Sequence, residues 1–252
     1  MVHLQAHIIS VVIGRSILEN FAIWVRNMAV LFYAMEQTQN DPKIVSLVNL
    51  VEYLPIFLFA FIGGAFADRL NPKNTIIICD ILSILSIVGI LFVIQYGWIY
   101  ILIATFVSVI LSQFSQPSSN VIIKGHLSPK NMNMVIGLNQ SIPSIFLVIG
   151  PVIGTSLFLY LGIEACLILF GICFFISLLL AFLLPEIEKE SANEKQHVWL
   201  DMKEGLFYLK NNSNINVIPF VYFFLALGIG LVQPLDVFLI MDRLQLQKES
   251  IE

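Results

Sequence analysis

Seven stretches of about 20 or more mostly apolar residues follow one another along this chain. A helix that crosses a membrane needs about 20 such residues, because it rises about 1.5 Å per residue through a hydrocarbon core about 30 Å thick. The strands of a membrane barrel would be about half as long and would alternate in polarity. The pattern therefore predicts membrane-spanning helices, over residues 7–35, 44–66, 75–94, 98–123, 134–160, 162–184 and 217–241.

The composition supports an all-α membrane protein and excludes several other classes. Charged residues make up 12% of the 252 residues and hydrophobic residues 58%, whereas a soluble domain is about a quarter charged. A net charge of −4 offers no basic surface for a nucleic acid. The sequence also contains no nucleophile–base pair, phosphate loop or metal-ligand spacing. We therefore expect membrane lipid as its surroundings, no nucleic-acid partner, no cofactor, no metal and no enzymatic activity.

Lysine and arginine fall mainly in alternate connections between the spans, which predicts the orientation of the chain. The connections after the second, fourth and sixth spans carry Arg69, Lys73, Lys124, Lys130 and four further lysines, whereas the opposite connections carry one lysine, Lys43. Cytoplasmic connections are enriched in these residues. We therefore predict a multi-pass protein of the cell membrane with a cytoplasmic N-terminus.

The polar stretch 185–216 interrupts the apolar pattern. Within it Val198, Trp199, Met202, Leu206 and Leu209 recur at helical spacing, which favours an amphipathic helix on the cytoplasmic membrane surface; a plain solvated linker is the alternative. The predicted organisation is a six-helix bundle (1–184), a cytoplasmic loop with this helix (185–216), and a seventh helix with a short extracellular tail (217–252).

Charged residues lie inside the first two spans, where burial in lipid is costly. Arg15, Glu19 and Arg26 fall within about 40° of one another on a helix, so we expect this face to line a proton or substrate pathway. Glu52 lies at a depth similar to that of Arg26, which predicts an Arg26–Glu52 pair. The pair could be a static salt bridge, or Arg26 could tune the proton affinity of Glu52.

Other polar residues of the spans have less specific interpretations. Asp80 is predicted to be a structural acid at a helix end near Lys73. Gln113, Gln116 and Asn139 are candidates for polar contacts with a substrate, although hydrogen bonding between helices is the commoner role of such side chains.

The connection between the second and third spans contains Gly64, the pair Asp68-Arg69 and Lys73, and this pattern resembles the signature loop of the major facilitator superfamily. Glycines allow two helices to approach closely there, and an Asp-Arg pair can form charge-assisted hydrogen bonds. Asn71 and Pro72 depart from the usual glycine and arginine. The matching positions are Gly64, Asp68, Arg69 and Lys73.

The fifth span contains Ile149-Gly150-Pro151-Val152-Ile153-Gly154, which is similar to the Gly-Pro motif of antiporters in that superfamily. Pro151 removes a backbone donor, and Gly150 and Gly154 remove side chains, so the helix can bend and pack tightly. A purely structural kink is the alternative. Phe146 and Thr155 stand where the family pattern has further glycines.

Two further segments resemble the macrolide-efflux and enterobactin-exporter branch of the superfamily. They are Gln116-Pro117 followed by Asn139, and the stretch Asp201-Met202-Lys203-Glu204-Gly205-Leu206-Phe207-Tyr208-Leu209. The resemblance covers essentially the whole chain. It implies a secondary transporter that exports a drug-like or siderophore-like solute against protons.

Transporters of this type rock two six-helix halves around a site near the membrane midplane. Seven spans correspond to one half and one further helix, so we expect an incomplete transporter, with a missing second half or self-association as its partner. A seven-helix receptor or scaffold without transport activity is the alternative.

Overall fold

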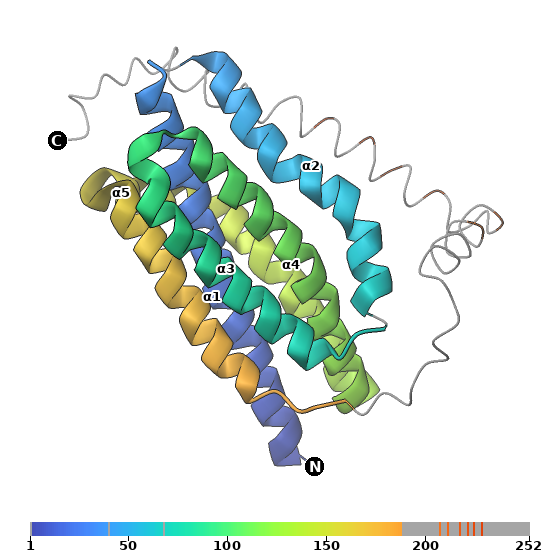
Figure 1. The fold of residues 1–252 in the computed structure, drawn as a ribbon. Helices are drawn as coiled ribbons and strands as arrows, with labels where there is room; N and C mark the ends of the chain where they lie inside the picture. The colour runs from blue at the N-terminus through green and yellow to red at the C-terminus, as the bar shows by residue number, and fades with distance from the viewer. Residues whose placement is uncertain are drawn as a thin grey trace. The chain divides into compact units, whose positions relative to one another are not determined.

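The computed structural model describes residues 2–39, 41–67 and 69–187, together with six single residues further along the chain. The chain divides into two compact units, Met1–Lys195 and Gln196–Glu252. In the first unit, every regular element among the described residues is a helix (Figure 1). The all-α class predicted from the sequence is therefore confirmed.

The helices begin and end close to the predicted limits of the spans. The first four predicted spans correspond to α1–α4, and the fifth and sixth fall together within α5. With α5 counted as one helix, the described part of the chain contains five helices long and apolar enough to cross a membrane. The elements are α1 (Val2–Gln37), α2 (Pro42–Ala67), α3 (Pro72–Val93), a short 3-10 helix η1 (Ile94–Tyr96), α4 (Ile99–His126) and α5 (Pro129–Phe182).

A single glycine divides α5 into two arms. As one straight helix its 54 residues would extend about 80 Å, far more than the thickness of a bilayer. Gly162 has φ 76° and ψ 177°, which interrupts the helix, and a positive φ is accessible to glycine without steric cost. The chain reverses direction at this break, so the arms 129–161 and 163–182 run antiparallel to each other (Figure 1). The predicted connection at 161–162 therefore lies where the backbone turns.

Local sequence also explains where other helices begin and end. The Asn71 side chain accepts a hydrogen bond from the backbone N–H of Asn74 at 3.2 Å, and Pro72 occupies the first turn of α3. This is a favourable helix start, because proline needs no hydrogen-bond acceptor there. Gly97 has φ 154° after η1, which ends that segment before α4.

The helices pack unequally along the bundle. α1 packs mainly against α5, α3 lies between α4 and α5, and α2 packs against α4. Near the start of α1, the helices α1, α3, α4 and α5 together form one hydrophobic core. Near the other end of α1, residues of α1 and α5 form a smaller core. The first core contains Ile8, Val11, Val12, Ile76, Ile122, Ile123, Leu127, Val135, Ala181 and Leu184, and the second contains Val25, Ala29, Phe158 and Cys166.

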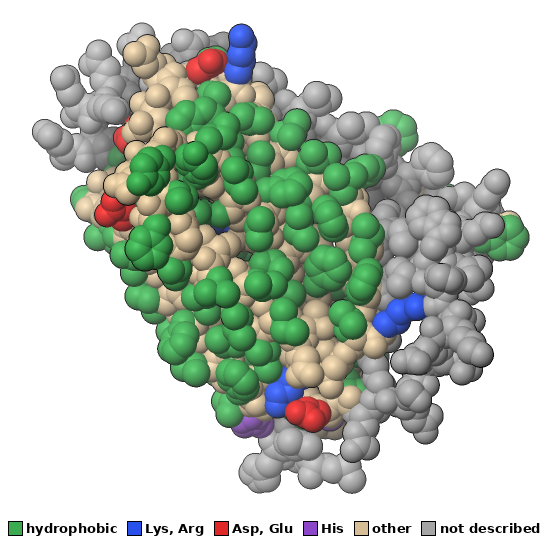
Figure 2. Space-filling model, in the orientation of Figure 1, with side chains coloured by type: hydrophobic (Ala, Val, Ile, Leu, Met, Phe, Trp, Pro, Cys, Tyr) green, Lys and Arg blue, Asp and Glu red, His purple; other side chains and the backbone are tan. Residues whose placement is uncertain are grey.

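The outer surface of the bundle is apolar. On the face drawn in Figure 2, hydrophobic side chains cover the middle of the molecule, and charged side chains lie toward its ends. Large hydrophobic side chains such as Phe92, Val148 and Tyr160 are more than 70% exposed. Such a surface would be unfavourable in water and fits contact with lipid hydrocarbon.

The predicted amphipathic helix within 185–216 and the seventh span at 217–241 lie largely outside the described residues. Beyond residue 187 the structure describes single helical residues, namely Phe207, Asn211, Val217, Val221, Phe224 and Gly228.

Candidate functional site

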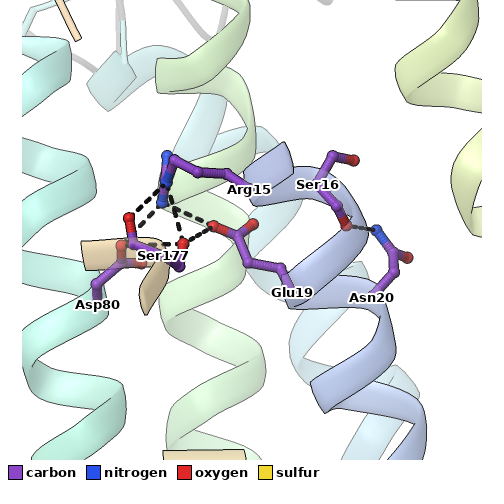
Figure 3. Close-up of polar contacts among 6 residues, drawn as sticks. All are labelled: Arg15, Ser16, Glu19, Asn20, Asp80 and Ser177. Carbon is purple, nitrogen blue, oxygen red and sulfur yellow. Dashed lines mark hydrogen bonds and ion pairs between the residues drawn. The ribbon is translucent and has the colours of Figure 1, made fainter. Parts of the chain in front are cut away.

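Buried charges from two helices meet a serine of a third helix around Arg15 of α1 (Figure 3). Arg15 Nη2 donates to Glu19 Oε1 at 2.7 Å and to Asp80 Oδ2 of α3 at 2.9 Å. Its Nε donates to the Oγ and the carbonyl oxygen of Ser177, at 3.0 and 3.2 Å. Ser177 lies in the second arm of α5, and its hydroxyl donates to Glu19 at 2.8 Å. The network therefore joins α1, α3 and α5.

The charges of this network do not balance. Two carboxylates surround one guanidinium, and the side chains of Arg15 and Asp80 are only 4% and 2% exposed. Because one Nη2 atom binds both Glu19 and Asp80, the two carboxylates must lie close together. Neighbouring carboxylates in an apolar interior repel each other unless a proton or a cation neutralises one of them. The arrangement is therefore chemically suited to hold and release a proton.

A second buried arginine lies on the same helix and has different partners. Arg26 Nε and Nη2 donate to Asn27 Oδ1 at 3.1 and 2.7 Å. Asn27 Nδ2 in turn donates to Glu52 Oε1 of α2. The guanidinium carbon lies 5.2 Å from the centre of the Phe170 ring, and Phe170 stacks on Phe174. This second site therefore joins α1 to α2 and to the second arm of α5.

Among the described residues, Arg26 and Glu52 do not form a direct salt bridge, and they are linked through Asn27 instead. Both ion pairs found among the described residues involve Arg15, and Asn27 separates Arg26 from Glu52. The physical reason is the chemistry of the amide, which accepts from a guanidinium and donates to a carboxylate at once. Asn27 satisfies both charged groups without bringing them into contact.

The charged face of α1 is directed into the bundle. Arg15 contacts Asp80 and Ser177, and Arg26 lies over Phe170. Arg15 and Arg26 are 3% and 2% exposed, so α3 and the second arm of α5 cover this face. The sequence grouped these charges on one face of the helix, but it did not predict which helices cover that face.

The predicted role of Asp80 is also wrong. Asp80 lies in the third turn of α3, is 1% exposed and binds Arg15 rather than Lys73 at the helix end. A lone acid in an otherwise apolar span needs a cation at the same depth in the membrane. That requirement was the sequence signal that could have identified the contact between Asp80 and Arg15. Ser177 carries no such signal, because hydroxyl groups are common in membrane helices.

The predicted polar contacts with a substrate lie elsewhere. Gln113 Nε2 donates to Ser112 Oγ at 3.0 Å on α4, and Gln116 is exposed. The Oδ1 atom of Asn139, in the first arm of α5, is buried and has no hydrogen-bond partner among the described residues. Among the residues that the structure describes, none of these three side chains bonds to either arginine site.

The signature loop joins α2 to α3. Gly64 lies in the last turn of α2 and Lys73 in the first turn of α3, with Arg69 between them; Asp68 lies outside the described residues. A Cβ at Gly64 would meet nothing within 4 Å, whereas a Cβ at Gly63 would lie 2.0 Å from the carbonyl oxygen of Gln113. The close approach to a neighbouring helix is therefore at Gly63, toward α4.

The Gly-Pro motif brings the first arm of α5 onto α1. A Cβ at Gly150 would lie 2.4 Å from Trp24 Cγ, and one at Gly154 would lie 2.8 Å from the Trp24 carbonyl oxygen. Within α5, Gly162 is the residue with non-helical dihedral angles, and Pro151 keeps helical ones. The two glycines therefore serve close helix packing, and the backbone break lies at Gly162.

A protein family matches most of the chain. The family described as Major Facilitator Superfamily matches residues 16–249. This range includes Arg26, the signature loop and the Gly-Pro motif, and it begins one residue after Arg15.

Individual relatives are more distant. "Uncharacterized MFS-type transporter YkuC" of Bacillus subtilis (strain 168) is 28% identical over 210 residues, which cover 79% of this chain and 49% of the relative. "Macrolide efflux protein A" of Streptococcus pyogenes is 23% identical over 218 residues, which cover 82% and 53%. The chain therefore spans about half the length of the curated relatives that it matches.

Proposed function

The chain belongs to the major facilitator superfamily of transporters, and on that premise we propose that the protein exports a largely apolar solute in exchange for protons. The observation that carries this proposal is the unbalanced network of Arg15, Glu19 and Asp80 inside the helical bundle. A group that holds one exchangeable proton within the membrane is what coupling to a proton gradient requires.

Two observations support the proposed class of solute. A relative at low identity carries the name macrolide efflux protein A, and macrolides are large, largely apolar molecules with polar substituents. The Asn139 oxygen, which has no hydrogen-bond partner among the described residues, offers an acceptor for one such substituent. We extend the proposal to drug-like and siderophore-like solutes, with Gln113 and Gln116 as further polar contacts.

Membership of a transporter family argues against the alternative of a receptor or scaffold. Alternating access requires a second helical bundle that faces the described one. In the proposed transporter, further polypeptide or a second copy supplies that bundle, and the N-terminus lies in the cytoplasm.

Inverted membrane vesicles from cells that express the gene test both the coupling and the solute. Respiration acidifies the lumen of such vesicles, so an exporter of this kind accumulates radiolabelled erythromycin there, and a protonophore abolishes the accumulation. Glu19→Gln should reduce uptake to the level of vesicles without the protein, because it removes one of the two proton-binding groups. Glu36→Gln is the matched control, since Glu36 is exposed near the end of the same helix.

The outcomes separate the parts of the proposal. Uptake that persists with the protonophore would exclude proton coupling. Full activity of the Glu19→Gln variant would remove the carboxylate pair from the mechanism. If neither erythromycin nor a panel of apolar dyes accumulates, export of an apolar solute is wrong.

A further inference from the structure

We propose that Asn27 is a positioning residue that holds the Glu52 carboxylate near the positive charge of Arg26 and thereby sets how readily Glu52 takes up a proton. The proposal rests on the function proposed above for its role in transport, but the contact itself can be tested without transport. The observation behind it is the chain of hydrogen bonds from Arg26 through one amide to Glu52.

We call this chain of hydrogen bonds, from Arg26 through Asn27 to Glu52, the relay. Its Arg26 end is held in place. A guanidinium only donates hydrogen bonds, and two of its N–H groups point at the same oxygen of Asn27. The Phe170 ring lies against the guanidinium at 5.2 Å, a distance at which a cation is attracted to an aromatic face. Arg26 is 2% exposed, so its charge acts on its neighbours with little screening by water.

The orientation of the Asn27 amide follows from these partners. Because Arg26 occupies the amide oxygen, the amide nitrogen is left for Glu52, and an ionised carboxylate only accepts hydrogen bonds. The amide therefore stabilises the ionised form of Glu52 in two ways. It donates a hydrogen bond to the carboxylate, and it fixes the distance between the carboxylate and Arg26.

Tyr53 directly follows Glu52 on α2, and the other titratable groups of the neighbouring helices lie farther away along the helix axes. On α1 the charged residues next to Arg26 are Glu19 and Glu36, seven and ten residues away, which is about 10 Å or more along the axis. On α4, which packs against α2, the titratable residues lie near the two ends. They are Tyr100, Lys124 and His126.

Gaining or losing a proton at Glu52 therefore changes a contact between α1 and α2. When Glu52 is protonated, the Asn27 amide faces a neutral acid, and the attraction between Arg26 and Glu52 disappears. Since α2 packs mainly against α4 and only slightly against α1, this relay is a place where protonation can loosen one helix from another.

The test is the protonation of Glu52 itself, measured by infrared spectroscopy on the purified full chain in lipid. The band of the protonated Glu52 carboxyl is identified by its loss in Glu52→Gln, and its intensity is followed against pH. Asn27→Asp removes the donated hydrogen bond, places a like charge beside Glu52 and neutralises Arg26. All three effects favour the protonated acid, so the midpoint should rise by about one pH unit or more.

Two further variants keep the proposal falsifiable. Asn27→Leu removes the hydrogen bond without adding charge, so it should raise the midpoint by less than Asn27→Asp. Asn20→Asp is the matched control, because the Asn20 amide lies two turns earlier on α1 and bonds to the Ser16 carbonyl of its own helix; its Glu52 midpoint should equal that of the wild type.

An unchanged midpoint in both Asn27 variants, or an equal rise in the Asn20 variant, would overturn the relay. So would the absence of a titrating Glu52 band over the whole pH range in which the protein stays folded. A shifted midpoint in a protein that transports nothing would support the relay while contradicting the proposed function.

Discussion

Arg15 and Arg26 lie on the same helix, eleven residues apart and equally buried, yet their charges are compensated in different ways. Arg15 contacts two carboxylates directly and is surrounded by α3 and α5, near the core to which four helices contribute. Arg26 contacts an amide and an aromatic ring, and it reaches one carboxylate only through that amide. The smaller core beside it comes from two helices.

This difference shows that burial alone does not decide what a charged residue does in a membrane protein. Direct contact with two acids ties three helices together and leaves an excess negative charge, which suits proton binding. Contact through an amide leaves one positive and one negative charge in balance and joins helices that otherwise pack little against each other. Variants at the two sites can test whether the sites differ in stability as this interpretation requires.

The largest effect is expected from Arg15→Met. It leaves Glu19 and Asp80 buried without a cation, so the free energy of unfolding should fall by about 3–5 kcal/mol, or the protein should fail to accumulate. Chemical unfolding in detergent micelles measures this loss. Adding Glu19→Gln and Asp80→Asn to the same protein should restore most of the stability, because no charge then remains unpaired. A stable Arg15→Met variant would contradict the interpretation of this site as a tie between helices.

A smaller effect is expected from Arg26→Met. It leaves the Asn27 amide oxygen without its donor, while Glu52 keeps the amide donor and is only partly buried. Loss of one satisfied polar group costs about 1–3 kcal/mol. The same unfolding measurement on both variants compares the sites directly. If Arg26→Met proves as damaging as Arg15→Met, the distinction between direct and relayed compensation is wrong.

The smallest effect is expected from Ser177→Ala at the Arg15 site. The hydroxyl accepts from Arg15 and donates to Glu19, but the Ser177 carbonyl oxygen still accepts from Arg15 after the substitution. The expected loss is about 1 kcal/mol. Ser156→Ala is the control, since the exposed Ser156 hydroxyl bonds within its own helix and its loss should leave stability nearly unchanged. Equal stability of the two variants would show that the hydroxyl is dispensable.

The sequence was sufficient for the helices and insufficient for their contacts. Apolar length alone placed the spans, because a membrane-crossing helix has a required length, and the break at Gly162 fell at the predicted connection. The grouping of Arg15, Glu19 and Arg26 on one face followed from helical periodicity. Which acid meets which arginine depends on how helices rotate and slide against one another, and no local pattern records that. The sequence therefore pairs Asp80 with the wrong cation, and it does not predict that Asn27 bonds to both Arg26 and Glu52.

The fit of the Gly150 and Gly154 positions against Trp24 illustrates the same limit. The motif showed that a close approach was possible, but the helix that approaches came only from the structure. Likewise, Gly63 rather than Gly64 of the signature loop meets α4.

The order in which the Arg15 network is synthesised has a consequence for assembly in the cell. Arg15 and Glu19 leave the ribosome first, Asp80 follows, and Ser177 comes last, on the second arm of α5. Because a single residue, Gly162, separates the arms, we expect them to leave the translocation machinery together, as a hairpin. We therefore expect the first helices to wait beside that machinery, with Arg15 incompletely enclosed, until the hairpin arrives and closes the bundle around the charges.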